Sequence, residues 1–426
     1  MKAEESVKNY PASVRMYTNY TVREIKKICK NIGPRIAGSE QEHEAHKYIA
    51  EEMKTCCDKV DIEDFKLSPE AFMSWVRIDG ALVILAVIFA WLTKFVDVSF
   101  NFAWVSVALV AVALVFLFCE FLMYWEFYDF LFPKATSHNT IGVRKAGGET
   151  KQRIIFSGHV DSSHEWTYTR LGGAPLLFAV GGYGIVSMLF VLVSSILIVA
   201  NVGTPELQQI LRYIQLACIP GGIAVMFFVN FNITVEGAND NLTGTLAAAT
   251  ALKMLDEAGI NFKNTEVVAM ITDGEEAGLR GAKQFAKDHY KEYMESGVET
   301  AVLCVDTLTD RDYLNVYSRD MTGTVKHDPA FCHLVMDAAI EAGHDDLEFA
   351  NVFFGSSDAA AFTQAGITAT CLAAMDPSPA DYYHNRRDSY DRLVPEAIEA
   401  SYDIIMSTIL KFADEDVEVK KEETAE

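Results

Sequence analysis

The chain has 426 residues, of which 50% are hydrophobic and 22% are charged, and its formal net charge is −23. This charge disfavours nucleic acid as a partner, because contacts to phosphates need clustered Lys and Arg side chains. The high apolar content beside a normal share of charged residues predicts a soluble domain joined to membrane-spanning segments.

Alternating helices and strands are predicted outside the apolar runs. In chain order we expect helices over 21–31 and 40–54, a buried strand over 153–161, a helix over 244–259, a strand over 265–272, a helix over 278–297 and a strand over 300–306. Apolar strands that alternate with helices are typical of an α/β sandwich with a largely parallel sheet. On the second helix, His43 and His46 share a face that we expect to be solvated rather than to bind a metal.

Four uncharged runs have lengths near that of a membrane span, and they cover residues 80–93, 98–119, 174–200 and 213–235. The last three reach the roughly 20 residues that a spanning helix needs. The first is shorter, and we expect it to extend through Lys94, whose long stem can carry its ammonium group to the interface. Because these runs are apolar on every face, we prefer spanning helices to buried helices of a soluble core. The short turns between partners predict four transmembrane α-helices in two hairpins.

Acidic and His-containing clusters fall at the apparent ends of three strands: "GHVD" (158–161), "DGEE" (273–276) and "CVD" (304–306). In open α/β sheets the carboxyl ends of the strands face the binding crevice, so these clusters are expected to converge on one site. Asp161 follows His159 by two residues on the same strand face, where a carboxylate can orient the imidazole of a metal ligand.

Three further carboxylates complete the predicted metal site. Glu275 and Glu276 are neighbours at a turn, so one can bind a metal while the other holds a proton. Asp240 stands just ahead of a predicted helix, and its two oxygens can bridge two ions.

The ordered motifs resemble the family-28 metallopeptidases, a family of co-catalytic zinc aminopeptidases whose clan includes glutamate carboxypeptidase, glutaminyl cyclase and the transferrin receptor. The resemblance begins at "IGPRIAGSEQEHEAHKYIAEEM" (32–53) and continues through "IIFSGHVDSS", "GANDNLTGTLAAATALKML", "ITDGEEAGLRGAKQFAK", "VLCVDTLTD", "FFGSSDAAAFTQAGI" and "YYHNRRDSYDRL". It implies a three-layer α/β/α sandwich with a mostly parallel mixed sheet.

Carried over residue by residue, the resemblance implies a dinuclear site for two Zn²⁺ ions or other divalent metals. His159 and Asp306 would hold one ion, Glu276 and His384 the other, Asp240 would bridge them, Glu275 would be the general base, and Asp161 would stand behind His159. Tyr382 or Tyr383 would contact the oxyanion or the substrate, or would simply pack. Ala359 stands where the family often has a His, so contacts from that loop are not carried over.

The largest departure from the family is an inserted hairpin between Asp161 and Asp240. Because His159 and Asp240 must meet at one metal pair, the chain between them crosses the membrane an even number of times. The resulting division is an N-terminal part of the peptidase domain (1–72), a first transmembrane hairpin (73–133), a second peptidase segment (134–170), a second hairpin (171–236), a third peptidase segment (237–413) and an acidic disordered tail (414–426).

Basic residues predict the side of the membrane on which the peptidase lies. Lys and Arg gather near the spans on the peptidase side, whereas the turns carry only Lys94 and Arg212. The positive-inside rule then places the peptidase of this multi-pass protein in the cytoplasm. Eight cysteines without zinc-finger spacing agree, since they predict free thiols in a reducing compartment.

The predicted function is that of a membrane-anchored, zinc-dependent exopeptidase, an aminopeptidase that hydrolyses N-terminal peptide bonds through a metal-activated water. The alternatives are a carboxypeptidase, a glutaminyl-cyclase-like acyl transfer on the same site, and a non-catalytic receptor or scaffold on a peptidase fold. The expected partners are peptide substrates and the lipid bilayer. Because few residues separate the last predicted span from Asp240, we expect hydrophobic peptides taken at the membrane surface.

Overall fold

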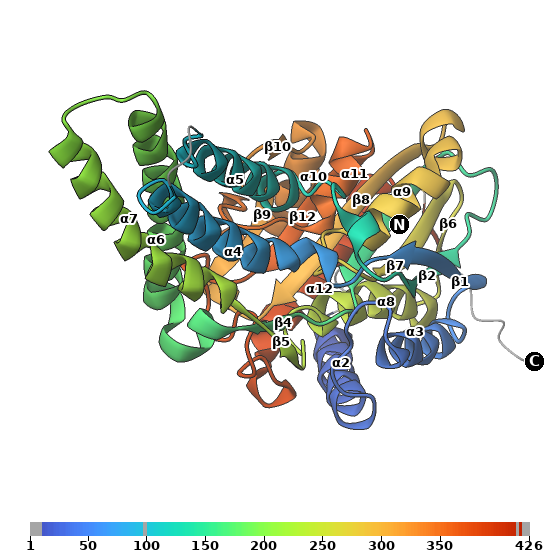
Figure 1. Ribbon diagram of the computed structural model, residues 1–426. Coiled ribbons are helices and arrows are strands. Elements are labelled where there is room, and N and C mark those ends of the chain that lie inside the picture. The colour runs from blue at the N-terminus through green and yellow to red at the C-terminus, as the bar shows by residue number, and fades with distance from the viewer. Residues whose placement is uncertain (1–10, 97–99, 415–416, 420–426) are drawn as a thin grey trace, which may run out of the picture. The chain divides into compact units, whose positions relative to one another are not determined.

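The computed structural model describes residues 11–96, 100–414 and 417–419 (Figure 1). The chain divides into two compact units, and each is built from separate stretches of sequence. The first unit contains the residues up to Pro69, Pro133–Ser163 and the residues from Thr234 onward, and the second contains Glu70–Phe132 and His164–Ile233. The second unit therefore consists of two insertions into the first.

The first unit is built around a nine-stranded mixed sheet. Its four central strands run parallel, in the spatial order β7 (Thr265–Thr272), β3 (Gln152–His159), β8 (Glu299–Leu308) and β12 (Thr368–Ala374). These strands are almost continuously apolar and buried, as strands covered by helices on both faces are.

Strands in mostly antiparallel pairs complete the sheet at both edges. Beyond β7 lie β2 (Ala135–Arg144) and β1 (Lys59–Leu67), and beyond β12 lie β9 (Leu314–Asp320), β10 (Val325–Lys326) and β11 (Phe349–Asn351), of which β11 pairs in parallel with β9. The predicted α/β sandwich with a mixed sheet is confirmed, and its parallel strands form the centre.

Helices cover both faces of this sheet. One connected layer contains five helices: α2 (Pro11–Asn31), α3 (Glu40–Met53), α8 (Leu242–Glu257), α10 (Pro329–Glu341) and α12 (Pro395–Phe412). Another layer contains two helices that pack against each other, α9 (Arg280–Asp288) and α11 (Asp358–Gln364). The main core lies between the sheet and the first layer, where small side chains such as Ala247, Ala248 and Ala251 let α8 approach Ile154 and Phe156 of β3 closely. Short elements fill the connections: β6 (Ile260–Phe262), η3 (Lys291–Glu295), η4 (Arg311–Tyr313) and η5 (Tyr390–Arg392).

The second unit contains four helices that are long and apolar enough to cross a membrane. They are α4 (Ala71–Leu92), α5 (Ala103–Phe116) with its π-helical continuation η1 (Leu117–Leu122), α6 (Thr167–Val199) and α7 (Pro205–Met226). Within the unit α4 packs against α5 and α7, and α6 also packs against both. The unit also contains η2 (Asp129–Leu131) and a two-stranded sheet of β4 (His164–Trp166) and β5 (Val229–Thr234).

The four helices differ from their predicted bounds: the second covers Ala103–Leu122 instead of 98–119, the third covers Thr167–Val199 instead of 174–200, and the first and fourth differ more. The first was expected over 80–93 with an extension through Lys94, but α4 begins at Ala71 and ends at Leu92. The helix contains the charges that interrupt the apolar run: Arg77 stacks over the ring of Phe231 at 4.1 Å, and Asp79 is fully buried with no hydrogen bond to its carboxylate within the described residues.

The fourth helix ends at Met226, so its prediction through Val235 is wrong at the carboxyl end. Residues 229–234, with the sequence VNFNIT, form β5 instead. Apolar residues alternate with polar ones in this stretch, and that period is typical of a strand rather than a helix.

The tail predicted to be disordered over 414–426 lies largely outside the described residues. Its described part includes β13 (Val417–Val419), which pairs antiparallel with β6. This strand differs from the prediction, and its two valines flanking Glu418 give it the alternation of a strand.

Candidate metal centre

The candidate metal centre lies where the parallel strands end. His159 is the last residue of β3, Glu275 and Glu276 follow β7, and Asp306 stands near the end of β8. Such strand ends meet at one edge of the sheet, as the sequence predicts. Asp240 enters from the turn before α8, and His384 from the loop between β12 and η5.

These side chains form two groups that share Asp240. In the first group His159 Nε2 lies 3.3 Å from Asp240 Oδ1 and 3.8 Å from Asp306 Oδ1. In the second group His384 Nε2 lies 3.3 Å from Asp240 Oδ2 and 3.1 Å from Glu276 Oε1. Within each group the donor atoms lie within 4.8 Å of one another. The structure thus brings together all five residues named as ligands, with one oxygen of Asp240 facing each group.

Asp161 connects the first group to the DGEE turn. Its Oδ1 lies 3.3 Å from Nδ1 of His159. The same carboxylate accepts the backbone N–H groups of Glu275 at 3.2 Å and Glu276 at 3.1 Å. Asp161 is fully buried, so these contacts fix both the imidazole and the turn.

Asp388 holds the turn that carries Asp240. Its Oδ1 accepts the backbone N–H of Asn239 at 2.7 Å and the side-chain amide of Asn239 at 2.8 Å, and its Oδ2 accepts the backbone N–H of Asp240 at 3.1 Å. Burial raises the pKa of Asp388 to about 7, and the nearby charge of Asp240 adds to this shift. Sequence reasoning gave Asp388 no role, although it lies in the quoted segment "YYHNRRDSYDRL".

Asn241 joins the Asp240 turn to β8. Its Oδ1 accepts the backbone N–H groups of Gly244 at 2.9 Å and Thr307 at 3.1 Å, and its side-chain amide donates to the carbonyl of Val305 at 2.9 Å. Asn241 is buried and caps α8. Asn241 thereby fixes the turn that carries Asp240 relative to the strand that carries Asp306.

Two glycines let the start of α8 approach the ends of β3 and β8 closely. A Cβ at Gly158 would lie 2.5 Å from the backbone nitrogen of Thr245, and one at Gly244 would lie 2.0 Å from the carbonyl oxygen of Val305. Such contacts exclude any larger residue at either position. The start of α8 therefore lies directly against the strand ends that carry His159 and Asp306.

Arg35 is a third positioning residue that the sequence did not single out. Its guanidinium is fully buried and donates to the carbonyls of Val160 at 2.7 Å, Gly33 at 2.9 Å and Gly237 at 3.0 Å. It thereby links the segment after β3 to the turn before Asp240. Arg35 belongs to the motif "IGPRIAG", and that membership was its only sequence signal.

The charges in this site favour cations. Burial alone would lower the pKa of His384, but Glu276 and Asp240 raise it to about 10. Burial raises the pKa of Asp306 to about 7. Carboxylates thus outnumber imidazoles in a buried space, and bound divalent ions would offset the excess negative charge. The donors are imidazole nitrogens and carboxylate oxygens, which suit zinc.

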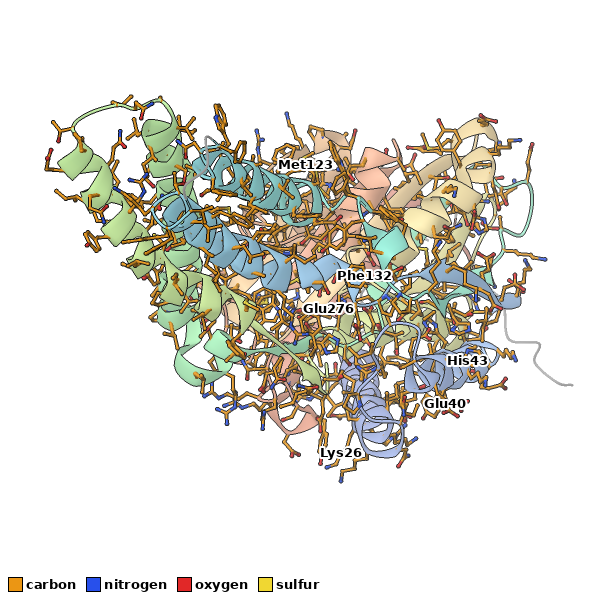
Figure 2. The ribbon with its side chains drawn as sticks, in the orientation of Figure 1. Lys26, Glu40, His43, Met123, Phe132 and Glu276 are labelled. Carbon is orange, nitrogen blue, oxygen red and sulfur yellow. The ribbon has the colours of Figure 1, made fainter. Side chains whose placement is uncertain are left out.

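Glu275 lies beside the two groups without belonging to either. Its Oε2 is 3.9 Å from His159 Nε2. Burial raises the pKa of Glu275 well above its usual value; His159 opposes this shift and Glu276 adds to it. Glu276, a member of the second group, is labelled in Figure 2.

The two tyrosines have different surroundings. The hydroxyl of Tyr382 is buried and donates to Asp310 Oδ2 at 3.0 Å. The ring of Tyr383 stacks on the imidazole of His384, with 3.9 Å between the ring centroids. Ala359 is buried in α11, next to Asp358, whose Oδ2 accepts the hydroxyl of Thr272 at 2.6 Å.

His43 and His46 do not form the solvated face that the sequence predicted. His46 is fully buried and His43 is half-buried, with its ring stacked on that of His138 at 3.9 Å between centroids. The helix turns this face toward β2, so helical spacing alone did not distinguish a buried polar face from a surface.

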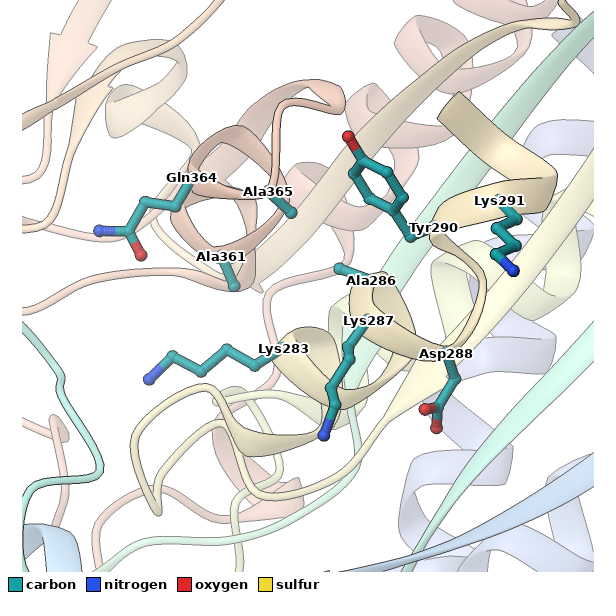
Figure 3. A pocket seen from close by; sticks show the side chains of 9 residues that line it. All are labelled: Lys283, Ala286, Lys287, Asp288, Tyr290, Lys291, Ala361, Gln364 and Ala365. Carbon is teal, nitrogen blue, oxygen red and sulfur yellow. The ribbon is translucent and has the colours of Figure 1, made fainter. Parts of the chain in front are cut away.

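A hollow of about 840 Å³ between α9 and α11 contains none of these residues (Figure 3). Lys283, Lys287 and Lys291 line one side, and Ala361 and Gln364 line the other. The hollow is open to solvent, and its lining residues belong to neither of the two groups around Asp240.

Comparisons with known proteins agree with this fold. The model of the family described as Peptidase family M28 matches residues 224–409. No curated protein has a sequence that matches this chain significantly. The resemblance to family-28 metallopeptidases is therefore confirmed over the segment that carries Asp240, the DGEE turn, Asp306 and His384.

Solved structures share the fold at low sequence identity. A leucine aminopeptidase precursor from Bacteroides thetaiotaomicron is similar with a TM-score of 0.52 and 12% identity, over 94% of this chain and 96% of that one. A zinc aminopeptidase from Bacillus subtilis is similar with a TM-score of 0.53 and 14% identity, over 96% of each chain. A glutaminyl cyclase from Fimbriiglobus ruber is similar with a TM-score of 0.55 and 12% identity, over 92% of this chain and 95% of that one.

Proposed function

We propose that this protein is a membrane-anchored, zinc-dependent exopeptidase that removes residues from the N-termini of peptides. The observation that carries the proposal is the position of Asp240, whose Oδ1 lies 3.3 Å from His159 Nε2 while its Oδ2 lies 3.3 Å from His384 Nε2. A carboxylate between two imidazoles, each with one further carboxylate, suits two zinc ions that share a ligand. The match to Peptidase family M28 supports the same proposal.

The chemistry divides between the ligands and Glu275. Two zinc ions bound here would lower the pKa of a shared water and polarise the scissile carbonyl. Glu275 would take the proton of the attacking water and deliver it to the leaving amine. Its burial, which raises its pKa, suits a carboxyl that must hold a proton between two steps. Asp161 would hold His159 and the DGEE turn in the same relative positions during both steps.

Hydrolysis of aminoacyl-anilides and short peptides by the purified protein tests this proposal. We expect activity that a chelator abolishes and that added zinc restores. Activity that persists in a metal-free preparation would contradict the proposal.

A second candidate function uses the same site. Several of the similar structures are glutaminyl cyclases, so cyclisation of an N-terminal glutamine is a specific alternative. Mass spectrometry separates the two reactions: cyclisation releases ammonia from a peptide of unchanged length, whereas aminopeptidase action shortens the peptide. Peptides with blocked amino or carboxyl ends separate both from a carboxypeptidase.

The four apolar helices support anchoring in a bilayer, and we propose that the peptidase unit lies on the cytoplasmic side. All eight cysteines are free, which supports a reducing compartment. The substrates we propose are hydrophobic peptides taken at the membrane surface. The chain from the end of α7 to Asp240 is short, with only β5 and a turn between them.

A further inference from the structure

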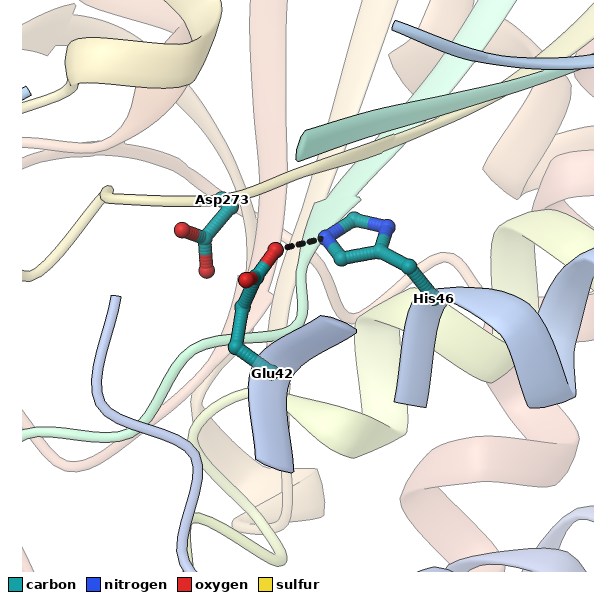
Figure 4. A group of neighbouring side chains, drawn as sticks. All are labelled: Glu42, His46 and Asp273. Atoms are coloured by element: carbon teal, nitrogen blue, oxygen red, sulfur yellow. Dashed lines mark ion pairs between the residues drawn. The ribbon is translucent and has the colours of Figure 1, made fainter. Parts of the chain in front are cut away.

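A second group of buried metal-binding side chains lies outside the candidate metal centre (Figure 4). Glu42 and His46 stand one turn apart on α3, and Asp273 follows β7 directly. All three side chains have an exposed fraction of 0%. Their donor atoms lie within 4.8 Å of one another, as the donor atoms do in each of the two groups around Asp240.

The hydrogen bonds of His46 leave one ring nitrogen directed at Glu42. His46 Nδ1 lies 2.8 Å from the hydroxyl oxygen of Thr140, and a hydroxyl can donate to this nitrogen or accept from it. Nε2 lies 3.1 Å from Glu42 Oε1, and this ion-pair contact does not have the geometry of a hydrogen bond. When the Thr140 hydroxyl accepts the proton of Nδ1, the lone pair of Nε2 faces the carboxylate, and a cation bound by both groups removes that repulsion.

Asp273 presents a buried oxygen to the same space. Its Oδ2 accepts the backbone N–H of Gly38 at 3.3 Å and the hydroxyl of Ser137. Its Oδ1 has no hydrogen-bond partner among the residues described. Burial raises the pKa of Asp273, and the neighbouring charge of Glu42 raises it further. A divalent cation bound here would supply the counter-charge that keeps both carboxylates ionised.

His138 supports Glu42 in the way that outer residues support metal ligands. Its Nδ1 lies 3.0 Å from each oxygen of Glu42, and its other face stacks on His43. Ligating carboxylates are commonly held by such hydrogen bonds, which fix their orientation toward the ion.

The contact between Glu42 and His46 matches one in the candidate metal centre. Glu276 Oε1 lies 3.1 Å from His384 Nε2, and this oxygen also makes no hydrogen bond within the described residues. Two atoms at that separation that are not hydrogen bonded fit two ligands of one ion, because tetrahedral ligands at about 2.0–2.1 Å from zinc lie roughly 3.3 Å apart.

We propose that Glu42, His46 and Asp273 bind a structural zinc ion, distinct from the pair of ions around Asp240. The ion would tie α3 to the end of β7 and so brace the turn that carries Glu275. This inference does not depend on the reaction proposed above, because it concerns metal content and stability alone.

The test is the zinc content of the full chain with the dinuclear centre disabled. In the double variant His159→Gln with His384→Gln, which removes the imidazole ligand of each ion of the dinuclear centre, equilibrium dialysis against zinc and elemental analysis should find one tightly held zinc ion per chain. Adding Glu42→Gln or His46→Gln should remove this ion, whereas adding His43→Gln, on the same helix but outside the group, should leave it. The zinc lost between the wild type and the double variant is a separate readout, and it tests the dinuclear centre.

Either of two results would overturn the proposal: a double variant with no tightly held zinc, or an ion that persists through both Glu42→Gln and His46→Gln. If these additional variants fail to fold, cobalt substitution in the double variant still decides the matter. A visible spectrum of a tetrahedral cobalt site with nitrogen and oxygen ligands supports the proposal, and the spectrum of hexaaquo cobalt alone refutes it.

Discussion

The carboxylate of Asp161 lies 3.3 Å from Nδ1 of His159, and both side chains are buried. Asp161 also accepts the backbone N–H groups of the DGEE turn. One residue thereby sets the orientation of a proposed ligand and of the proposed base.

Asp161→Asn should weaken both functions of this carboxylate. The amide presents N–H groups where the structure needs acceptors, so His159 and the DGEE turn lose their common anchor. Loss of such an outer partner lowers metal affinity or activity by about 10–100-fold. Zinc affinity, measured by titration, and kcat should both fall, and restoration of both quantities by Asp161→Glu would show a positioning role. An unchanged zinc affinity together with an unchanged kcat would refute it.

Glu275→Gln should separate metal binding from catalysis. The variant keeps the size of the side chain but removes the proton acceptor, and general base catalysis contributes about 10²–10⁴-fold. We expect kcat for an aminoacyl-anilide to fall by that factor while the zinc content stays at the wild-type value. Glu276→Gln serves as the comparison, because it should lose zinc as well as activity. A fully active Glu275→Gln enzyme would exclude Glu275 as the base.

Asp388→Asn should loosen the turn before α8. Asp388 Oδ2 accepts the N–H of Asp240 at 3.1 Å, and an amide nitrogen there would face that donor. A buried unsatisfied donor costs about 1–3 kcal/mol, so the free energy of unfolding should fall by that amount and zinc affinity should fall with it. The matched control is Asp391→Asn, which is exposed three residues further on and should change neither quantity. Equal stability of the two variants would contradict this role.

Zinc binding should release protons at neutral pH. In the metal-free chain the carboxylates raise the pKa of His384 to about 10, whereas a free histidine titrates near about 6.5. The proton on His384 therefore stabilises the metal-free fold fully below about pH 6.5, and this contribution is lost as pH rises through about 10.

Because zinc binds the neutral imidazole, its apparent affinity should rise with pH across the same window. Isothermal titration calorimetry at pH 7 in buffers of different ionisation enthalpy measures the released protons. A binding enthalpy that is independent of the buffer would contradict the expectation.

The cytoplasmic orientation predicts a specific labelling pattern. Cysteine introduced at residue 204, in the turn between α6 and α7, should react with an impermeant reagent in intact cells, and one near the C-terminus should not. A labelled C-terminus would reverse the assignment.

With the protein in lipid nanodiscs, matched apolar and polar peptides test the substrate proposal, and equal turnover of both sets would count against it.

The sequence predicted the central strands and the convergence of acidic residues well, because both depend on local patterns. The run "TEVVAMIT" contains the five consecutive apolar residues VVAMI and forms β7 over the same residues. The roles of Arg35, Asn241 and Asp388 were missed because each acts on backbone groups far away in sequence, a relationship that no local pattern records.

The boundaries of the apolar helices were less accurate for a related reason. Hydropathy counts each charge without its surroundings, so Arg77, which stacks on Phe231, and Asp79, which is buried, ended the predicted first span although α4 contains both. At the other end of the apolar segments, hydropathy merged β5 with α7, because both are apolar on average. His46 was assigned to the surface for the same reason, since polarity alone does not reveal a buried partner.

Anomalous diffraction at the zinc edge, from crystals of the zinc-loaded chain, tests the central claim most directly. The account predicts two peaks about 3.5–4 Å apart, one on each side of the Asp240 carboxylate, with His159 and Asp306 at one peak and Glu276 and His384 at the other, and the zinc ion proposed at Glu42, His46 and Asp273 adds a separate third peak. A single peak at Asp240, or none, would contradict it.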